Sequence, residues 1–142
     1  MIATGSMTVV FTSLRPMLCT KNLQGTIDFY TKQLGFELVG FSSADGFASL
    51  RRDVIELMVA LPNVHLPFEA PAFTGSLYFN VSDVASLWAS VKDGAQVVYP
   101  LEDFFYGMRE FAIYDNNGYM LKFGQPLGAH DGSSDRERRQ SG

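Results

Sequence analysis

The chain has 142 residues and a formal net charge of −4, and 46% of its residues are hydrophobic. This length suits one domain or two small halves that share a core, and the apolar content excludes a disordered chain. The negative charge argues against a general nucleic-acid binder. A single cysteine, Cys19, excludes an internal disulfide and is typical of a reducing compartment.

The two ends of the sequence are predicted to lie outside the globular body. Residues 1–13 are expected to form an N-terminal extension, which lacks the charged and apolar regions of a secretory signal. Residues 127–142 are charged and rich in Gly and Ser, which predicts a flexible tail. No apolar run approaches the roughly 18 residues that a membrane span requires. We therefore expect a cytoplasmic protein with no membrane partner.

A strand, a helix and three more strands are predicted between residues 14 and 60. Asn22 is a favourable N-cap, and Gly35 lies where a helix C-cap is expected. Between them, four apolar residues recur at helical spacing: Leu23, Ile27, Tyr30 and Leu34. The strands are predicted over four segments: 14–20, 36–41, 47–52 and 54–60.

The same order of elements returns between residues 75 and 126, after a linker. The linker, residues 61–74, contains three prolines and no periodicity. Ser82 or Asp83 is expected to cap the second helix, and Gly94 to end it. This helix is predicted by a second apolar stripe: Val84, Leu87, Trp88 and Val91. The strands are predicted over 75–81, 96–101, 109–115 and 119–124, with the turn "DNNG" between the last two.

The repeated order βαβββ indicates an internal duplication. A single such unit would leave one sheet face bare, so two of them are expected to combine into one curved sheet. Alternate residues of a strand face opposite sides, and the predicted strands have one apolar face and one mixed face. The apolar face is expected to carry the helices and the mixed face to line a cleft. The predicted fold class is α+β, with two βαβββ modules forming a cupped, mostly antiparallel sheet.

With this order, the stretches "NLQGTIDFYTKQLGFEL" and "YGMREFAIYDNNGYMLKFGQP" resemble the vicinal oxygen chelate superfamily. That superfamily includes glyoxalase I, extradiol dioxygenases, fosfomycin-resistance enzymes and bleomycin-resistance proteins. The resemblance covers roughly residues 14–126 and implies the glyoxalase/bleomycin-resistance fold. It says little about chemistry, because this fold hosts lyases, oxygenases, transferases and non-catalytic binders.

The resemblance also implies where a divalent metal would bind in the superfamily's enzymes. Those enzymes use a His or Gln at the start of each module's first strand and a Glu in each module's last strand. Matched residue by residue, these positions are Arg15, Glu56, Ser76 and Lys122. A metal ligand must offer a lone pair, whereas an arginine and a lysine present protons.

We therefore expect neither a metal nor another cofactor at these positions. Glu56 keeps the ligand chemistry and Ser76 is a weak substitute, while Arg15 and Lys122 are expected to neutralise Glu56 by ion pairing. The alternative is that Lys122 extends to solvent at the mouth of the cleft. The histidines, His65 and His130, lie in the linker and the tail.

The ligand-binding cleft is predicted from strand parity and from an aromatic loop at residues 104–106. Its expected residues are Arg15, Met17, Glu56, Met58, Ser76, Tyr78, Phe104, Phe105, Tyr106, Met120 and Lys122. The three loop aromatics could form a stacking surface for a flat or apolar ligand, or belong to ordinary core and dimer packing. No catalytic residue is predicted.

Four further residues have competing interpretations. Arg109 and Glu110 are adjacent and so face opposite sides of a strand; one could reach a ligand, although surface ion pairing is the commoner outcome. Trp88 lies on a helical stripe and is expected in the core. Cys19 shares a face with Arg15, which could lower the thiol pKa, but without a matching histidine we expect no nucleophilic catalysis.

The sequence favours a metal-free small-molecule-binding protein resembling bleomycin-resistance proteins. Such a protein would sequester an antibiotic or another aromatic or apolar compound, and a homodimer is expected. A cationic cleft would disfavour bleomycin itself and leaves an apolar or anionic ligand open. One alternative is a metal-dependent glyoxalase-like lyase or dioxygenase. Another is a non-catalytic interaction module that has kept the fold and lost its pocket.

Overall fold

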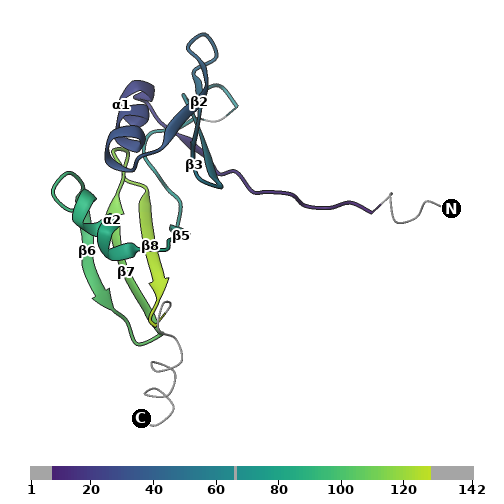
Figure 1. Ribbon diagram of the computed structural model, residues 1–142. Helices are drawn as coiled ribbons and strands as arrows, with labels where there is room; N and C mark the ends of the chain where they lie inside the picture. The colour runs from purple at the N-terminus through teal and green to yellow at the C-terminus, as the bar shows by residue number, and fades with distance from the viewer. Residues whose placement is uncertain (1–7, 66, 129–142) are drawn as a thin grey trace.

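The computed structural model describes residues 8–65 and 67–128 and contains two modules of the same element order (Figure 1). Of the predicted tail, residues 127–142, the part from residue 129 on, with His130, lies outside the described residues. Strands of the first module are β1 (Met17–Cys19), β2 (Glu37–Ser42), β3 (Phe47–Arg52) and β4 (Ile55–Ala60). Strands of the second module are β5 (Leu77–Asn80), β6 (Gln96–Asp103), β7 (Met108–Tyr114) and β8 (Met120–Pro126).

Each module carries helical structure after its first strand. Helix α1 (Leu23–Asp28) continues directly into the π-helix η2 (Phe29–Gln33), and α2 (Val84–Val91) is its counterpart. The predicted N-caps are present: the side chain of Asn22 accepts from the amide of Gly25, and that of Asp83 accepts from Ser86. Gly35 has a φ of +70°, which fits the expected helix end. No helix of the described residues is long and apolar enough to cross a bilayer.

The strands form two four-stranded sheets of equivalent topology. The orders are β1-β4-β3-β2 and β5-β8-β7-β6, with one parallel pair in each sheet, β1–β4 and β5–β8. The α+β class and the mostly antiparallel pairing are therefore confirmed. The described strands of the chain do not form one continuous sheet. Instead, β1 and β5 are edge strands of two separate sheets.

The predicted division of the strands into an apolar and a mixed face is confirmed by burial. In β4, Leu57 and Val59 are buried, whereas Glu56 and Met58 on the other face are half-buried. In β8, Leu121 and Phe123 are buried and Lys122 is half-buried. The core lies between the apolar faces and the helices, where the stripe of the first helix is almost fully buried at Ile27, Tyr30 and Leu34.

The two modules are joined by polar contacts of the "DNNG" turn between β7 and β8. One carboxylate oxygen of Asp115 accepts from the amides of Asn117, Gly118 and Tyr119, and the other accepts from the Tyr30 hydroxyl at 2.6 Å. The Tyr119 hydroxyl meets the backbone of Cys19 in the first module. The turn therefore fixes the relative position of η2, β1 and the second sheet, and the first module lies above the second in Figure 1.

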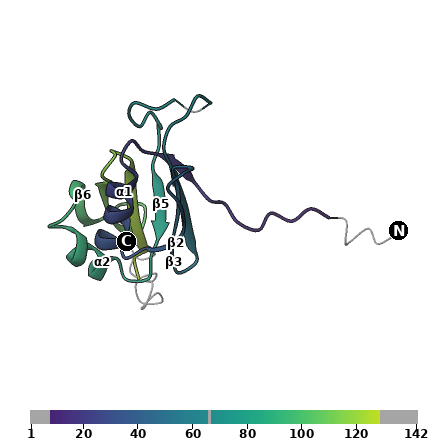
Figure 2. The ribbon, with the colours of Figure 1, turned by 90° about the horizontal axis from the view of Figure 1, so that it is seen from above.

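An apolar arm precedes the first strand. Residues 8–14 extend away from the body (Figures 1 and 2), and Val9, Phe11 and Leu14 are each at least 80% exposed. Arg15 and Ser76 were predicted inside strands, but β1 starts at Met17 and β5 at Leu77, so both residues lie just before them. At β1 this shift follows from Pro16, which has no amide hydrogen to donate to a strand ladder.

Candidate functional site

An ion pair occupies two of the four positions singled out by sequence. A guanidinium nitrogen of Arg15 (Nη1) lies 3.1 Å from Oε2 of Glu56, and the two side chains are 48% and 26% exposed. The pairing follows from the backbone, because the Met58 amide donates to the Pro16 carbonyl at 2.8 Å and β1 then runs parallel to β4. The predicted neutralisation of Glu56 by Arg15 is therefore present.

Lys122 has a different neighbourhood from the one predicted. It lies on β8 between Tyr78 of β5 and Ala112 of β7 in the strand register. Among the described residues, no ion pair within 4 Å includes Lys122, so the expected pairing with Glu56 is not formed in this chain. Likewise, no hydrogen bond of residues 8–65 and 67–128 joins Ser76 or Lys122 to Arg15 or Glu56.

Glu110 is a polar residue of the second sheet for which the sequence leaves two interpretations open, contact with a ligand and surface ion pairing. Its residue surface is only 1% exposed. The Tyr78 hydroxyl donates to Oε1 at 2.7 Å, and the Tyr99 hydroxyl donates to Oε2. The Tyr106 hydroxyl also lies near this carboxylate and helps to lower its pKa. Three tyrosines from β5, β6 and the β6–β7 loop thus converge on one buried carboxylate.

These contacts decide the protonation of the cluster. Burial opposes ionisation of Glu110, but the hydrogen bonds of Tyr99 and Tyr78, the nearby Tyr106 hydroxyl and the positive charge of Lys122 hold its pKa below the ordinary value. Burial and the same carboxylate raise the pKa of the Tyr78 and Tyr99 hydroxyls well above the ordinary value. At neutral pH the cluster therefore contains one carboxylate and three protonated phenols.

Gly124 is the residue that lets Tyr78 reach the carboxylate. It lies opposite Glu110 on β7 and opposite Asn80 on β5. A Cβ atom at this position would overlap the Tyr78 hydroxyl. A glycine inside a strand often marks such a close approach, so Gly124 in "YMLKFGQP" was the signal that could have pointed to this cluster.

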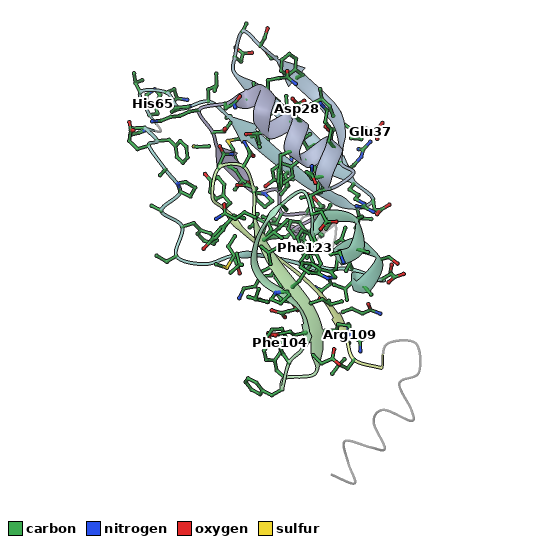
Figure 3. The ribbon with its side chains drawn as sticks, turned by 90° about the vertical axis from the view of Figure 1, so that its left-hand side faces the viewer. Asp28, Glu37, His65, Phe104, Arg109 and Phe123 are labelled. Atoms are coloured by element: carbon green, nitrogen blue, oxygen red, sulfur yellow. The ribbon has the colours of Figure 1, made fainter. Side chains whose placement is uncertain are left out.

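The aromatic loop lies at the end of the β6–β7 hairpin. Phe104 and Arg109 are found there in Figure 3, far from Asp28 and Glu37 of the first module. Rings of Phe104 and Tyr106 are stacked with centroids 5.5 Å apart. Phe105 is 99% exposed and Tyr106 51% exposed. The loop thus presents aromatic surface to solvent, and the Tyr106 hydroxyl lies near Glu110.

The base of this loop is held by a surface ion pair. Arg109 contacts both carboxylate oxygens of Asp103, at 2.6 and 3.2 Å. The predicted surface pairing therefore holds for Arg109, whereas the same expectation is wrong for Glu110. Trp88 packs on Phe111 with centroids 5.1 Å apart, as expected for a core residue.

The methionines of the predicted cleft lie on the mixed faces of the two sheets. Met17 and Met58 are register partners in the first sheet, and Met17 is 50% exposed. Met120 pairs with Tyr114 in the second sheet. The second sheet thus carries Tyr78, Lys122, Met120 and the loop aromatics. The first sheet carries Glu56, Met17 and Met58, with Arg15 beside them.

The donor set does not fit the divalent metal that the fold's enzymes bind. At two of the four implied positions the side chains are cations, and the carboxylate of Glu56 is engaged by Arg15. In the described part of the chain, no group of three His, Cys, Asp or Glu side chains is placed to hold a metal ion.

Comparison with known proteins agrees with this architecture. A family model described as the Glyoxalase/Bleomycin resistance protein/Dioxygenase superfamily matches residues 12–123. No curated protein matches the chain. A solved structure of a protein of unknown function from Agrobacterium tumefaciens str. C58 is similar with a TM-score of 0.69 and 17% identity. It aligns over 86% of this chain and 99% of its own.

Two further solved structures carry more specific descriptions. TioX from Micromonospora sp. ML1 is 24% identical, with a TM-score of 0.66 over 82% of this chain and all of its own. A bleomycin-binding protein complexed with bleomycin is 21% identical, with a TM-score of 0.65 over 81% of this chain and 98% of its own. At these identities the likeness shows the fold alone. Because the family model matches well over half of the sequence, the chain belongs to the Glyoxalase/Bleomycin resistance protein/Dioxygenase superfamily.

Proposed function

We propose that the protein is a cytoplasmic, metal-free binder that sequesters a flat aromatic compound, such as an antibiotic, on the mixed faces of its sheets. The observation that carries this proposal is the buried Glu110 carboxylate, which holds Tyr78 and Tyr99 in place beside an exposed aromatic loop that includes Tyr106. Rigid aromatic rings bind flat ligands at a low cost in conformational entropy. The cluster supplies such rings.

The charges on these faces favour an anionic ligand over a cationic one. The carboxylate of Glu56 is neutralised by Arg15, and that of Glu110 is covered by phenol hydroxyls. Lys122, on the same face as Tyr78, has no ion-pair partner within 4 Å among the described residues. An anionic group on the ligand would therefore find an available ammonium.

We further propose that a second copy of the chain completes the groove. The strands β1 and β5 each leave one edge unpaired by another described strand, and exposed edges of this kind favour pairing with another chain. Arg15 and Met17 lie at the β1 edge, and Tyr78 lies on β5. A homodimer that joins these edges would place the two halves of the predicted cleft side by side.

A series of three ligands with one ring system tests the proposed function. The probes are 2-naphthoate, 2-naphthamide and 2-naphthylmethylammonium, titrated by calorimetry into protein dialysed against EDTA. We expect 2-naphthoate to bind most tightly and the ammonium compound most weakly, by about tenfold or more. Tyr78→Ala and Tyr106→Ala should each weaken 2-naphthoate binding. The control is Phe41→Ala, which removes an exposed ring of the first sheet on the face opposite to the groove. Failure of all three probes to bind would contradict the proposal.

A further inference from the structure

One concave feature of the described residues lies away from the proposed groove. It is a cavity of about 400 Å³ between the two modules, lined by the end of η2, the β3–β4 turn, the end of β5 and one side of α2. None of the predicted groove residues lines it. A volume of this size is in the range of small-molecule sites.

The floor of this cavity is apolar and aromatic. Leu34, Phe36, Phe79 and Phe123 line it, and Phe123 lies in the middle of the molecule in Figure 3. Phe79 stacks on Phe123 with centroids 4.9 Å apart and an interplanar angle of 13°. Stacked rings continue beneath α2, because Phe123 also stacks on Phe111. A flat ring entering the cavity would meet the end of this stack.

The charged groups at the rim already have partners. Arg52 donates to the Leu34 carbonyl at 2.6 Å and lies 4.0 Å from the carboxylate of Asp53. Asp83 caps α2 by accepting from the amide and the hydroxyl of Ser86. The rim thus carries one guanidinium and two carboxylates, each with a partner within the rim, and this excess of negative charge disfavours an anionic ligand most.

Two polar side chains of the lining remain available for hydrogen bonds. Among residues 8–65 and 67–128, no side-chain hydrogen bond is made by Asn80 or Ser82, and both residues are exposed. An amide and a hydroxyl can donate to or accept from an uncharged carbonyl, hydroxyl or amine group. The polar side of the cavity therefore suits a neutral hydrogen-bonding ligand.

We propose that this cavity is a second binding site, specific for an uncharged, flat aromatic compound with one hydrogen-bonding group. The proposal is independent of the groove and of its anionic preference, because the two sites share no residue. The aromatic floor would hold the rings, and Asn80 and Ser82 would bind the polar group.

The test uses N-phenyl-1-naphthylamine, an uncharged two-ring fluorophore with one N–H group. Its emission should rise on titration with the wild-type protein. Ser86→Phe and Ser90→Phe place a ring in the cavity from α2 and should each weaken binding at least tenfold. Ala85→Phe and Ala89→Phe add the same ring at exposed positions of this helix that do not line the cavity, and should bind within about twofold of wild type.

Two more measurements separate this site from the groove. Tyr106→Ala should leave binding of the neutral probe unchanged, and the anionic 1-anilinonaphthalene-8-sulfonate should compete for the cavity at least tenfold more weakly. Circular dichroism and thermal unfolding check that each variant folds. The proposal is overturned if the neutral probe does not bind, if Tyr106→Ala abolishes binding, or if the Ser→Phe variants bind like their alanine-site controls.

Discussion

The hydroxyl of Tyr78, on β5, lies 2.7 Å from Oε1 of Glu110, on β7, across the intervening strand β8. This contact links a ring that is 41% exposed to a carboxylate that is almost fully buried. The carboxylate cannot touch a ligand directly while the tyrosines cover it. Its role in the proposed groove is therefore to position the rings of Tyr78 and Tyr99.

Replacing the carboxylate should loosen these rings. Glu110→Gln removes the charged acceptor, and we expect a loss of about 1–3 kcal/mol in the free energy of unfolding. Binding of 2-naphthoate should weaken, and Glu110→Asp should restore little because its carboxylate is one carbon shorter. Glu102→Gln, at the exposed register partner of Glu110 on β6, is the control. Denaturant unfolding and calorimetry report the two effects separately. Equal stability of Glu110→Gln and Glu102→Gln would argue against a positioning role.

A second prediction concerns the space that Gly124 leaves for Tyr78. Gly124→Ala should displace the Tyr78 hydroxyl and cost about 1–3 kcal/mol, because the added methyl group overpacks the site. Gly40→Ala is a matched control within a strand, where the new Cβ would lie at an ordinary 3.5 Å from Ser49. Thermal unfolding of both variants provides the comparison. A Gly124→Ala protein as stable as Gly40→Ala would show that the sheet adjusts at no cost.

The depressed pKa of Glu110 predicts an acid-dependent loss of stability. An unfolded glutamate has a pKa of about 4.3, so the native state gains stability from Glu110 only above that pH range. This gain is lost as the pH falls through the lower folded pKa. The free energy of unfolding should therefore fall less steeply from pH 6 to pH 3 in Glu110→Gln than in wild type. Parallel curves would mean that Glu110 does not titrate differently on folding.

The contact between the modules gives a prediction about stability alone. Tyr30→Phe removes the hydroxyl that donates to the buried Asp115 carboxylate, and should cost about 1–3 kcal/mol. Tyr114→Phe is the control, since the Tyr114 hydroxyl makes no hydrogen bond among the described residues. Binding of 2-naphthoate should change little in either variant when measured well below the unfolding temperature. A cost below about 0.5 kcal/mol for Tyr30→Phe would show that water replaces the lost donor.

The shared groove requires a dimer in solution. Sedimentation equilibrium at micromolar concentration should give twice the mass of one chain. Replacement of Met17, at the exposed edge strand β1, by Asp should shift the protein toward monomer by placing a charge in the interface. Met58→Asp lies on the neighbouring central strand and should disturb the dimer less. If the wild-type protein is a monomer, two subunits cannot share a groove. The Glu110 cluster is unaffected by that result, because its contacts lie within one chain.

Much of the fold could be predicted from local signals. The sequence predicts Asn22 and Asp83 as helix caps because their short polar side chains suit that position. Each side chain accepts a hydrogen bond from a backbone amide of its helix. The "DNNG" turn and the alternation of buried and half-buried residues in β4 and β8 were equally local. The π-helix η2 was not foreseen, since its apolar stripe is compatible with an ordinary helix.

The candidate site was less predictable because it depends on contacts between distant strands. Arg109 and Glu110 look alike as neighbouring charged residues of one strand. The pairing of Arg109 with Asp103 comes from an adjacent hairpin strand, whereas the partners of Glu110 come from three separate segments. By analogy with a metal site, the sequence predicts that Lys122 pairs with Glu56. The strand register instead places Lys122 opposite Ala112, two residues from Glu110 on β7, and its charge lowers the pKa of Glu110.

The central claim is that an aromatic ligand binds without a metal. Calorimetric titration of the EDTA-dialysed protein with 2-naphthoate, repeated with Zn²⁺, Ni²⁺ or Mn²⁺ added, tests it most directly. We expect the same affinity and stoichiometry in all four titrations, because Arg15 and Lys122 repel a dication and Arg15 already neutralises Glu56. Binding that appears only when a metal is added, with one metal ion retained per chain, would contradict the account.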